Sequence, residues 1–315
     1  MNKTFDVYNV IMVKVDEKDL MSFLLKNDID DNAQSKYPLD LLTEEIMSVI
    51  PEYAYADYKG SRIGQTNAYK KLKEAANAIY KIKEFDLMYK AYCSTDVEER
   101  KRAKIELEKM PFRNRGEFGE IILHFLLRDF KNTIPLVSKV YFKDSSGVPA
   151  HGFDAVHISP DDEILWLGES KLYTDAKEGI KALVQDLDNH LKTDYLNDQF
   201  VLIGKNITNN SIPQRDIWIK KLTESRTLKD KLKFINIPML CIYENDIYDR
   251  FYDTESDEAS NYHEVNVKEL KSYFDERNKN PLREKCNVIL FLLPIKSKEE
   301  LVKRLHERLW HMQNM

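Results

Sequence analysis

The stretch GFDAVHISPDDEILWLGESKLY, residues 152–173, decides the fold of this chain. Its polar and apolar residues alternate, which predicts strands at residues 153–158 and 164–170, because successive side chains of a strand point to opposite faces. The Pro-Asp-Asp sequence at residues 160–162 predicts a turn between these strands. We therefore expect a β-hairpin here.

A symmetric hairpin about that turn places Val156 opposite Leu167 and Asp154 opposite Glu169. Directly opposed side chains have Cβ atoms about 5 Å apart, and like charges in such a pair are destabilising. The arrangement therefore calls for a cation, and carboxylate and carbonyl oxygens are the ligands that Mg²⁺ prefers. Lys171 lies two residues beyond Glu169 and so on the same strand face.

These three polar side chains, Asp154, Glu169 and Lys171, favour hydrolysis of a phosphodiester. A bound metal lowers the pKa of a water and stabilises charge on phosphate oxygens, and a lysine can hold or deprotonate that water. The structural alternative is a simple ion pair between Glu169 and Lys171 on an exposed strand. Asp154 and the symmetry of the hairpin argue against that alternative.

Around the hairpin, the pattern from residue 114 onward alternates between helices and strands, which predicts an α/β fold with a mixed sheet and helices on both faces. Ser297 is expected to cap the closing helix, with Glu300 completing a capping box. The acidic stretch 244–260 is predicted to be a surface loop. The expected helices are 116–130, 176–191, 215–229, 267–274 and 298–312, and the expected strands are 136–142, 200–203, 235–243 and 288–293.

The N-terminal part is expected to begin with a β-strand that is followed by helices. We divide the chain into residues 1–110, for contacts with a partner or DNA, and residues 111–315, the catalytic domain. The pattern predicts a strand within 5–15, a short helix at 20–25, and helices at 41–50, 67–92 and 96–110.

The hairpin residues resemble the PD-(D/E)xK nuclease superfamily. Gly152-x-Asp154 and Glu169-x-Lys171 match its signature, with Gly152 at the position of the proline. A preceding helix containing RGEFGEIILHFLL and a following helix with lysines match the flanking elements of that fold. By motif, the resemblance covers roughly residues 112–205.

This resemblance implies roles for particular residues. Glu120 would support a second ion or a water. Glu117, three residues earlier on the same helix face, is the other candidate, but it also suits an interaction with the helix macrodipole. The metal would be Mg²⁺, for which Mn²⁺ can substitute, and Lys171 would position the nucleophile. The implied metal ligands are Asp154, Glu169, the Ser170 carbonyl and Glu120.

Along its whole length the sequence resembles the HamA family, the nuclease subunits of Hachiman antiphage defence systems, and the related AbpA. The resemblance implies a DNA nuclease that forms a heterodimeric complex with a HamB-like helicase. The chain has no GxxxxGK[ST] motif, so ATP-driven work would belong to that partner.

The composition is that of an ordinary globular protein: 315 residues, with 43% hydrophobic and 32% charged. We expect a cytoplasmic protein without a signal peptide or a membrane span. Its three cysteines are far apart and odd in number, which predicts reduced thiols. The net charge of −5 argues mildly against a nucleic-acid partner, although carboxylates at a metal site contribute to that total.

Two other readings stay open. A catalytically silent nuclease fold could serve as a DNA-binding or assembly subunit, and the same site chemistry would act on RNA. His124, His151 and His157 are interpreted as structural, because His157 points to the strand face opposite Asp154. Basic residues are densest between 215 and 233, where Trp218 is expected to be buried.

Overall fold

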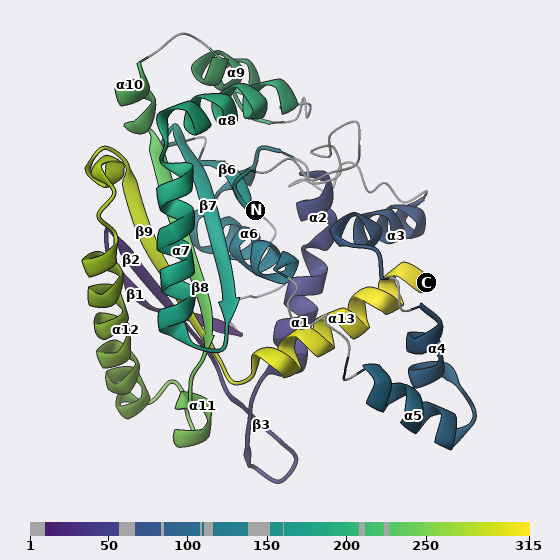
Figure 1. The fold of residues 1–315 in the computed structure, drawn as a ribbon. Coiled ribbons are helices and arrows are strands. Elements are labelled where there is room, and N and C mark those ends of the chain that lie inside the picture. The colour runs from purple at the N-terminus through teal and green to yellow at the C-terminus, as the bar shows by residue number, and fades with distance from the viewer. Residues whose placement is uncertain are drawn as a thin grey trace.

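The computed structural model describes residues 10–56, 67–82, 85–107, 109, 116–137, 152–159, 161–207, 212–223 and 227–315. It shows a mixed sheet of seven strands in the order β1-β2-β9-β8-β7-β6-β5 (Figure 1). Four central strands, β2, β9, β8 and β7, run parallel, and antiparallel pairs flank them. The strands are β1 (Ile11–Asp16), β2 (Leu20–Leu25), β5 (Ile134–Pro135), β6 (Ala155–Ser159), β7 (Ile164–Tyr173), β8 (Ile235–Glu244) and β9 (Asn287–Ile295). A separate pair joins β3 (Asp28–Ile29) to β4 (Ser35–Lys36).

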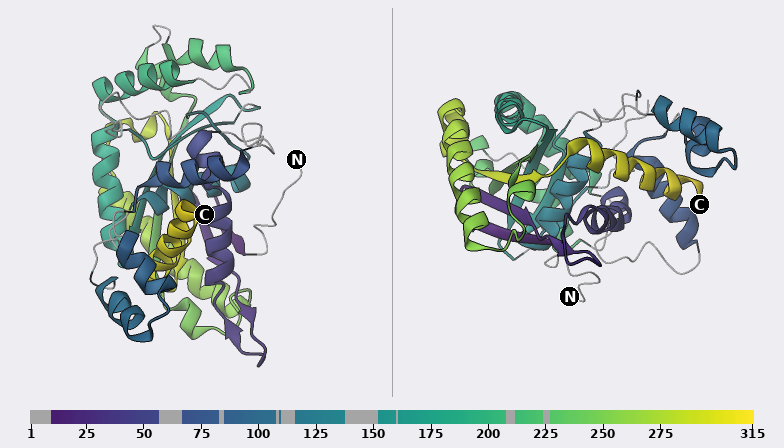
Figure 2. Two further views of the ribbon diagram at one scale, coloured as in Figure 1. Left: turned by 90° about the vertical axis from the view of Figure 1, so that its right-hand side faces the viewer. Right: turned by 90° about the horizontal axis from the view of Figure 1, so that it is seen from below.

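Helices cover both faces of the sheet, as Figures 1 and 2 show. In the first half of the chain they are α1 (Leu39–Ser48), α2 (Ile50–Tyr55), α3 (Ala68–Ile79), α4 (Phe85–Cys93), α5 (Val97–Leu107) and α6 (Glu117–Lys131). In the second half they are α7 (Ala176–His190), α8 (Thr193–Asn206), α9 (Arg215–Thr223), α10 (Leu228–Leu232), α11 (Ile247–Arg250), α12 (Asp257–Arg277) and α13 (Lys298–Asn314), with a 3-10 turn at Pro281–Glu284.

The core has two halves, one on each face of the sheet. Leu240 and Phe291 join the cluster that contains α1, α6 and α13, whereas their neighbours Met239 and Leu292 join the cluster that contains α7 and α12. This alternation follows from the period of two along each strand. The predicted class, an α/β protein with a mixed sheet between helices, is confirmed.

Several predicted elements are confirmed with small shifts of their ends. The hairpin strands are β6 and β7, and the helices around them are α6 and α7. Ser297 caps α13, since its side chain accepts a hydrogen bond from the Glu300 N–H. These elements have strong local patterns, so the sequence alone predicts them.

The helix predicted at residues 20–25 is wrong, because this segment is strand β2. All six residues are buried, and they pair with β1 on one side and β9 on the other. A short apolar run reads equally well as a helix or a buried strand. Pairing with the neighbouring strands β1 and β9 makes this run a strand.

The strand predicted at 200–203 is also wrong, because these residues lie within helix α8. Leu196, Phe200 and Ile203 are all buried and recur at helical spacing. Other predicted elements differ in extent. The helix expected at 67–92 is α3 and α4, the helix expected at 215–229 includes α9 and the start of α10, and the loop expected at 244–260 contains α11 and the start of α12.

The N-terminal strands β1 and β2 belong to the same sheet as the hairpin, and α13 packs on α1 and α3. The division at residue 110 stays a prediction. Of the strand expected at 136–142, residues 138–142 lie outside the described residues.

Within the described part of the chain, none of the helices has the length and apolar character needed to span a bilayer.

Candidate active site

The β6/β7 hairpin has the register that its sequence predicts. Val156 pairs with Leu167, and the last pair toward the open end joins Ala155 to Gly168. Asp154 comes directly before β6, and its carboxylate accepts hydrogen bonds of 2.8 Å from the Ser170 N–H and hydroxyl. The carboxylates of Asp154 and Glu169 therefore meet at the open end of the hairpin.

Helix α6 approaches this end of the hairpin closely because of two glycines. A Cβ atom at Gly119 would lie 3.1 Å from Ser170 Oγ, and one at Gly168 would lie 2.8 Å from Leu123 Cδ2. The missing side chains allow helix and strand to pack at short range. Glu120 follows Gly119 directly and is thereby carried next to the hairpin carboxylates.

Burial and like charge raise the pKa values of the two hairpin carboxylates. Burial is the largest cause of the raised pKa of Asp154, followed by the charges of Glu169 and Glu120. Glu169 is 4% exposed, and burial, opposed by the charge of Lys171, raises its pKa to about 8. Such shifts are frequent at functional sites. The charge of Glu120 is among the causes of both of these raised pKa values, so Glu120 lies close to both carboxylates.

Helix α7 holds both site residues of β7 through side chains that lie one turn apart. Lys171 forms an ion pair with Asp186, and His190 Nδ1 lies 2.9 Å from Glu169 Oε1. Burial lowers the pKa of Lys171, but the pair with Asp186 outweighs it and the pKa rises. Asp186 and His190 are not among the site residues predicted from the sequence, although their spacing of four on the helix after the motif strand is a usable signal.

Helix α2 supplies a further contact from the N-terminal region. The Tyr53 hydroxyl donates a 2.5 Å hydrogen bond to Glu120 Oε2. Burial, followed by the charge of Glu120, raises the pKa of Tyr53 well above its usual value, so the hydroxyl stays protonated. Tyr53 is distant in sequence from the hairpin, and no local pattern identifies it.

The site fits a divalent cation by the chemistry of its donors. Asp154, Glu169 and Glu120 place three carboxylates together, and two of them have raised pKa values in part through mutual repulsion. Among the described residues, no three His, Cys, Asp or Glu side chains converge closely enough to hold a metal. Asp154 instead bonds to Ser170, and Glu120 to Tyr53. Glu169 Oε1 is buried without a hydrogen-bond partner in the described chain, which suits an atom meant for a ligand.

Two of the histidines considered as possible metal ligands, His124 and His157, lie on the α6 side of the sheet. His124 Nδ1 lies 2.9 Å from His157 Nε2, and His157 Nδ1 lies 2.8 Å from Thr133 Oγ1. Both rings are buried, so they belong to a polar chain within the core. His151 lies outside the described residues.

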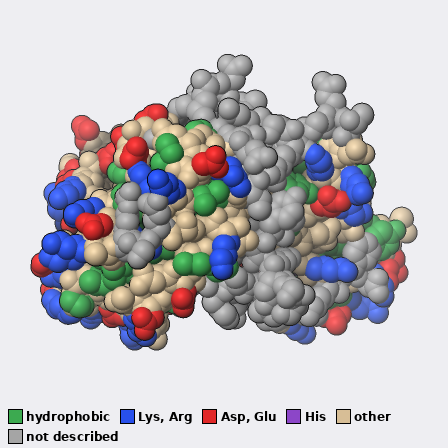
Figure 3. All heavy atoms as spheres, turned by 90° about the horizontal axis from the view of Figure 1, so that it is seen from above, with side chains coloured by type: hydrophobic (Ala, Val, Ile, Leu, Met, Phe, Trp, Pro, Cys, Tyr) green, Lys and Arg blue, Asp and Glu red, His purple; other side chains and the backbone are tan. Residues whose placement is uncertain are grey.

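Many basic side chains outside the site have acidic or structural partners. In the 215–233 stretch, Lys221 pairs with Glu163, and Lys231 is buried with its Nζ 3.3 Å from the Leu222 carbonyl. Trp218 is fully buried, as expected. Figure 3 shows Lys and Arg intermixed with Asp and Glu on the face seen from above.

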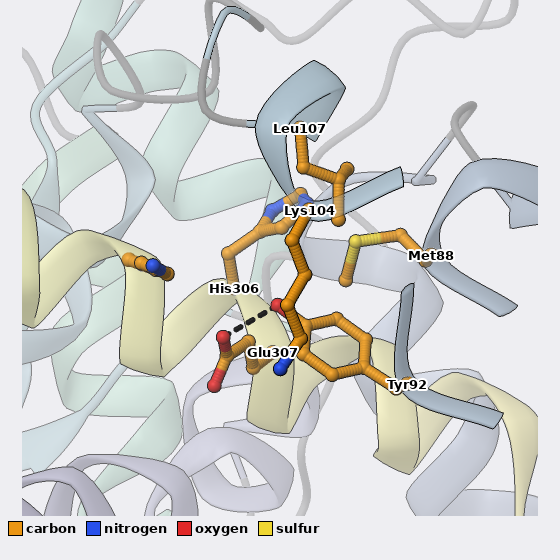
Figure 4. A pocket seen from close by; sticks show the side chains of 7 residues that line it. Met88, Tyr92, Lys104, Leu107, His306 and Glu307 are labelled. Carbon is orange, nitrogen blue, oxygen red and sulfur yellow. Dashed lines mark hydrogen bonds between the residues drawn. The ribbon is translucent and has the colours of Figure 1, made fainter. Parts of the chain in front are cut away.

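A separate small pocket of about 60 Å³ lies between α4, α5 and α13 (Figure 4). The Tyr92 hydroxyl donates a 2.5 Å hydrogen bond to Glu307 at its wall, and His306 Nδ1 lies 2.7 Å from the Tyr80 hydroxyl. None of its lining residues belongs to the hairpin site. These contacts join α13 to the N-terminal helices.

The mixed sheet and its hairpin, with Asp154, Glu169 and Lys171 at one end, define an α/β protein with the residue pattern of PD-(D/E)xK nucleases. The roles of these residues stay predictions. The family model of HamA matches residues 2–309, nearly the whole chain, and the chain belongs to this family. A search of curated proteins finds no match to the sequence.

Proposed function

We propose that this protein is a metal-dependent nuclease that hydrolyses phosphodiester bonds of DNA as the effector of an antiphage defence system. Membership of the HamA family supports a role in antiphage defence. The reaction itself is inferred from the site.

One observation carries the proposal: partly buried Asp154 and buried Glu169 meet at the end of a hairpin, with Lys171 on the same face as Glu169. The hairpin's Asp154 and Glu169 have raised pKa values, which makes the metal-free site electrostatically unfavourable. Such a cost is retained where it serves a ligand or a reaction.

Each residue has a distinct part in the proposed reaction. Asp154 and Glu169 would hold a divalent cation, which when bound stabilises negative charge on the phosphate and lowers the pKa of water. Lys171 Nζ, oriented by Asp186, positions the attacking water. The Ser170 N–H and hydroxyl orient Asp154, and the Tyr53 hydroxyl orients Glu120.

Cleavage of plasmid and linear DNA by the purified protein tests the reaction, with Mg²⁺ or Mn²⁺ and with EDTA. We expect metal-dependent cleavage that Lys171→Ala abolishes without loss of the folded state. The matched control is Lys181→Ala, which removes an exposed lysine of α7 paired with Glu178 and should leave the rate unchanged. An RNA substrate, run in parallel, determines the preferred nucleic acid.

The same assay includes the helicase subunit and ATP, because the family resemblance implies a HamB-like partner. Cleavage that appears only with this partner supports a nuclease that the complex controls. Equal cleavage by the wild type and Lys171→Ala would remove Lys171 from the mechanism. Failure to cleave under both conditions would favour the silent DNA-binding subunit instead.

A further inference from the structure

Helix α3 has an exposed surface made of one aromatic and two basic side chains. Tyr69, Lys70 and Lys73 form this α3 surface, because residues three and four positions apart share one face of a helix. Tyr69 is 57% exposed, and Lys70 and Lys73 are exposed as well. The other face of α3, with Ala75 and Ile79, is buried in the core. The three side chains of the α3 surface therefore point away from the body of the protein.

Acidic side chains balance the positive charge of the α3 surface only weakly. Lys73 has no ion-pair partner among the described residues. Lys70 lies 3.8 Å from Glu74, but the two side chains are 75% and 53% exposed, and such surface pairs contribute little. The Tyr55 hydroxyl also contacts this carboxylate, at 3.2 Å, and the first turn of α3 contains no acidic residue. Both lysines are therefore available to an external anion.

Helix α13, which packs on α3, has its basic side chains arranged differently. Arg304 pairs with Asp40, and Arg308 lies 3.7 Å from Glu44, so acids of α1 balance both arginines. These pairs belong to the packing of one helix of the chain on another. A single exposed aromatic ring is ordinary on a protein surface, but a ring beside two weakly paired lysines suits a partner that offers both negative charge and a flat face.

Helix α2 joins the α3 surface to the candidate active site. The Tyr55 hydroxyl lies 3.3 Å from the Lys71 carbonyl oxygen of α3, and Tyr53, two residues earlier on α2, donates its hydrogen bond to Glu120. Helix α2 also packs on both α3 and α6. Because one helix, about 10 Å across, separates α3 from the site, a polymer bound at the hairpin has the α3 surface within reach.

We propose that the α3 surface binds single-stranded nucleic acid, with Lys70 and Lys73 on phosphates and the Tyr69 ring stacked on an unpaired base. The proposal rests on the proposed function for nucleic acid as the ligand. Lysines that neutralise phosphates and an aromatic ring that stacks on a base are the two kinds of contact that single-strand binding uses. The net charge of −5 does not oppose it, because the acidic residues lie mostly elsewhere and the α3 surface is locally basic.

Fluorescence anisotropy of a labelled oligo(dT) with the full-length protein tests the two lysines. The titration is done in EDTA, so that metal-dependent cleavage does not interfere. We expect Lys70→Gln/Lys73→Gln to weaken binding about tenfold at low salt. The slope of log K against log salt should fall by about 1.4, since each phosphate contact to a single strand contributes roughly 0.7.

The matched control is Lys268→Gln/Lys279→Gln, which removes the same amount of charge. Both lysines are exposed, and they lie in and just after α12, on the opposite side of the molecule from α3 (Figure 1). This control should change neither the affinity nor the slope. Unchanged melting temperatures of all variants show that they are folded.

Substitutions of Tyr69 test the stacking contact. Tyr69→Ala should weaken binding of oligo(dT) about tenfold with the salt slope unchanged, and Tyr69→Phe should keep the wild-type affinity, because its ring still stacks. A blunt duplex should lose little affinity with Tyr69→Ala, since its bases are already stacked on one another. Equal losses on the single strand and the duplex would contradict the stacking contact.

A wild-type protein that does not bind oligo(dT), or binding that the α3 substitutions leave as it is, overturns the proposal. The second result would leave the α3 surface to an acidic protein partner. The binding readouts do not depend on cleavage. A nuclease whose binding ignores α3 keeps the proposed function and removes this proposal, whereas binding through α3 without cleavage supports this proposal and removes the proposed reaction.

Discussion

Two carboxylate–histidine pairs lie on either side of the sheet near the β6/β7 hairpin, and they differ in where the positive charge comes from. On the α6 side, Glu52 Oε1 lies 3.7 Å from His124 Nε2, and Arg128 contacts the same carboxylate at 3.1 Å. On the α7 side, Glu169 lies 2.9 Å from His190, but the nearby Lys171 is engaged by Asp186. The side chain of Arg128 supplies the positive charge beside the first pair. At the second pair Lys171 is engaged by Asp186, so the carboxylate and the imidazole have the composition of a site for a bound cation.

The comparison separates structural polar groups from functional ones by the balance of charge around them. Buried carboxylates and histidines occur in both places, so burial alone does not identify a site. Arg128 makes the Glu52 cluster part of the connection between α2 and α6, whereas around Glu169 the carboxylates of Asp154, Asp186 and Glu120 outnumber the nearby cation Lys171. Three predictions follow from this contrast.

The largest effect is expected on DNA cleavage when Glu169 is replaced by glutamine, with Glu52→Gln as the comparison. Glu169→Gln removes a proposed metal ligand and should lower DNA cleavage by roughly 10²- to 10³-fold, without lowering the melting temperature of the metal-free protein. Glu52→Gln, the matched change on the other face, should keep cleavage within about threefold. Initial rates with Mg²⁺ and Mn²⁺ measure both. Equal losses from the two variants would contradict the contrast.

Replacing Arg128, the cation beside Glu52, should lower the free energy of unfolding rather than the rate of DNA cleavage. Arg128→Met leaves Glu52 with less compensation in a partly buried place, and we expect a loss of about 1–3 kcal/mol in the free energy of unfolding. Urea denaturation of the metal-free protein measures it. Lys181→Ala, an exposed lysine, is the control and should change stability by less than about 0.5 kcal/mol. A stable Arg128→Met variant would show that the protein does not need this cation.

The smallest effect is the change of the free energy of unfolding with pH. Burial lowers the pKa of His157 to about 3, so below pH 6.5 the unfolded chain binds a proton that the folded protein does not. Stability from this group is therefore complete above about pH 6.5 and is lost as the pH falls, by up to about 1.4 kcal/mol per pH unit. Glu169 acts in the opposite direction, because its raised pKa of about 8 makes folding lose stability as the pH rises toward 8.

Denaturation of the Glu169→Gln variant in EDTA between pH 7 and 5 removes the opposing contribution of Glu169, while Asp154, whose pKa is also raised, still opposes the histidines. The free energy of unfolding should fall toward pH 5, and a further His157→Asn substitution should make that fall less steep. A slope that the second substitution does not change would mean that His157 is protonated in the folded protein. That result would contradict its assignment to a neutral, buried chain.

Much of the site follows from local patterns. The period of two in β7 places Glu169 and Lys171 on one face, and the turn after residue 159 determines the hairpin register that puts Asp154 at the same end. Helices α1, α6, α7 and α13 have clear periodicity or caps. These features depend on neighbours within a few residues, which the sequence displays directly.

The remaining features depend on contacts between distant segments. Residues 20–25 form a strand because β1 and β9 lie on either side of them, and 200–203 form part of a helix because one face of α8 packs on the core. Apolar runs of that length suit either structure. Residues 138–151, which include His151 and join β5 to Gly152, lie outside the described residues.

By itself, the sequence determined the hairpin, its three polar residues and the α/β class, because periodicity and turn chemistry act over a few residues. Only the tertiary structure decided that Tyr53 reaches Glu120, that Asp186 holds Lys171, and that His190 faces Glu169. The last two pairs join a strand to the helix after it, and the first joins residues 67 positions apart. Such pairings arise when helices pack on the sheet, and no short-range pattern in the chain encodes them.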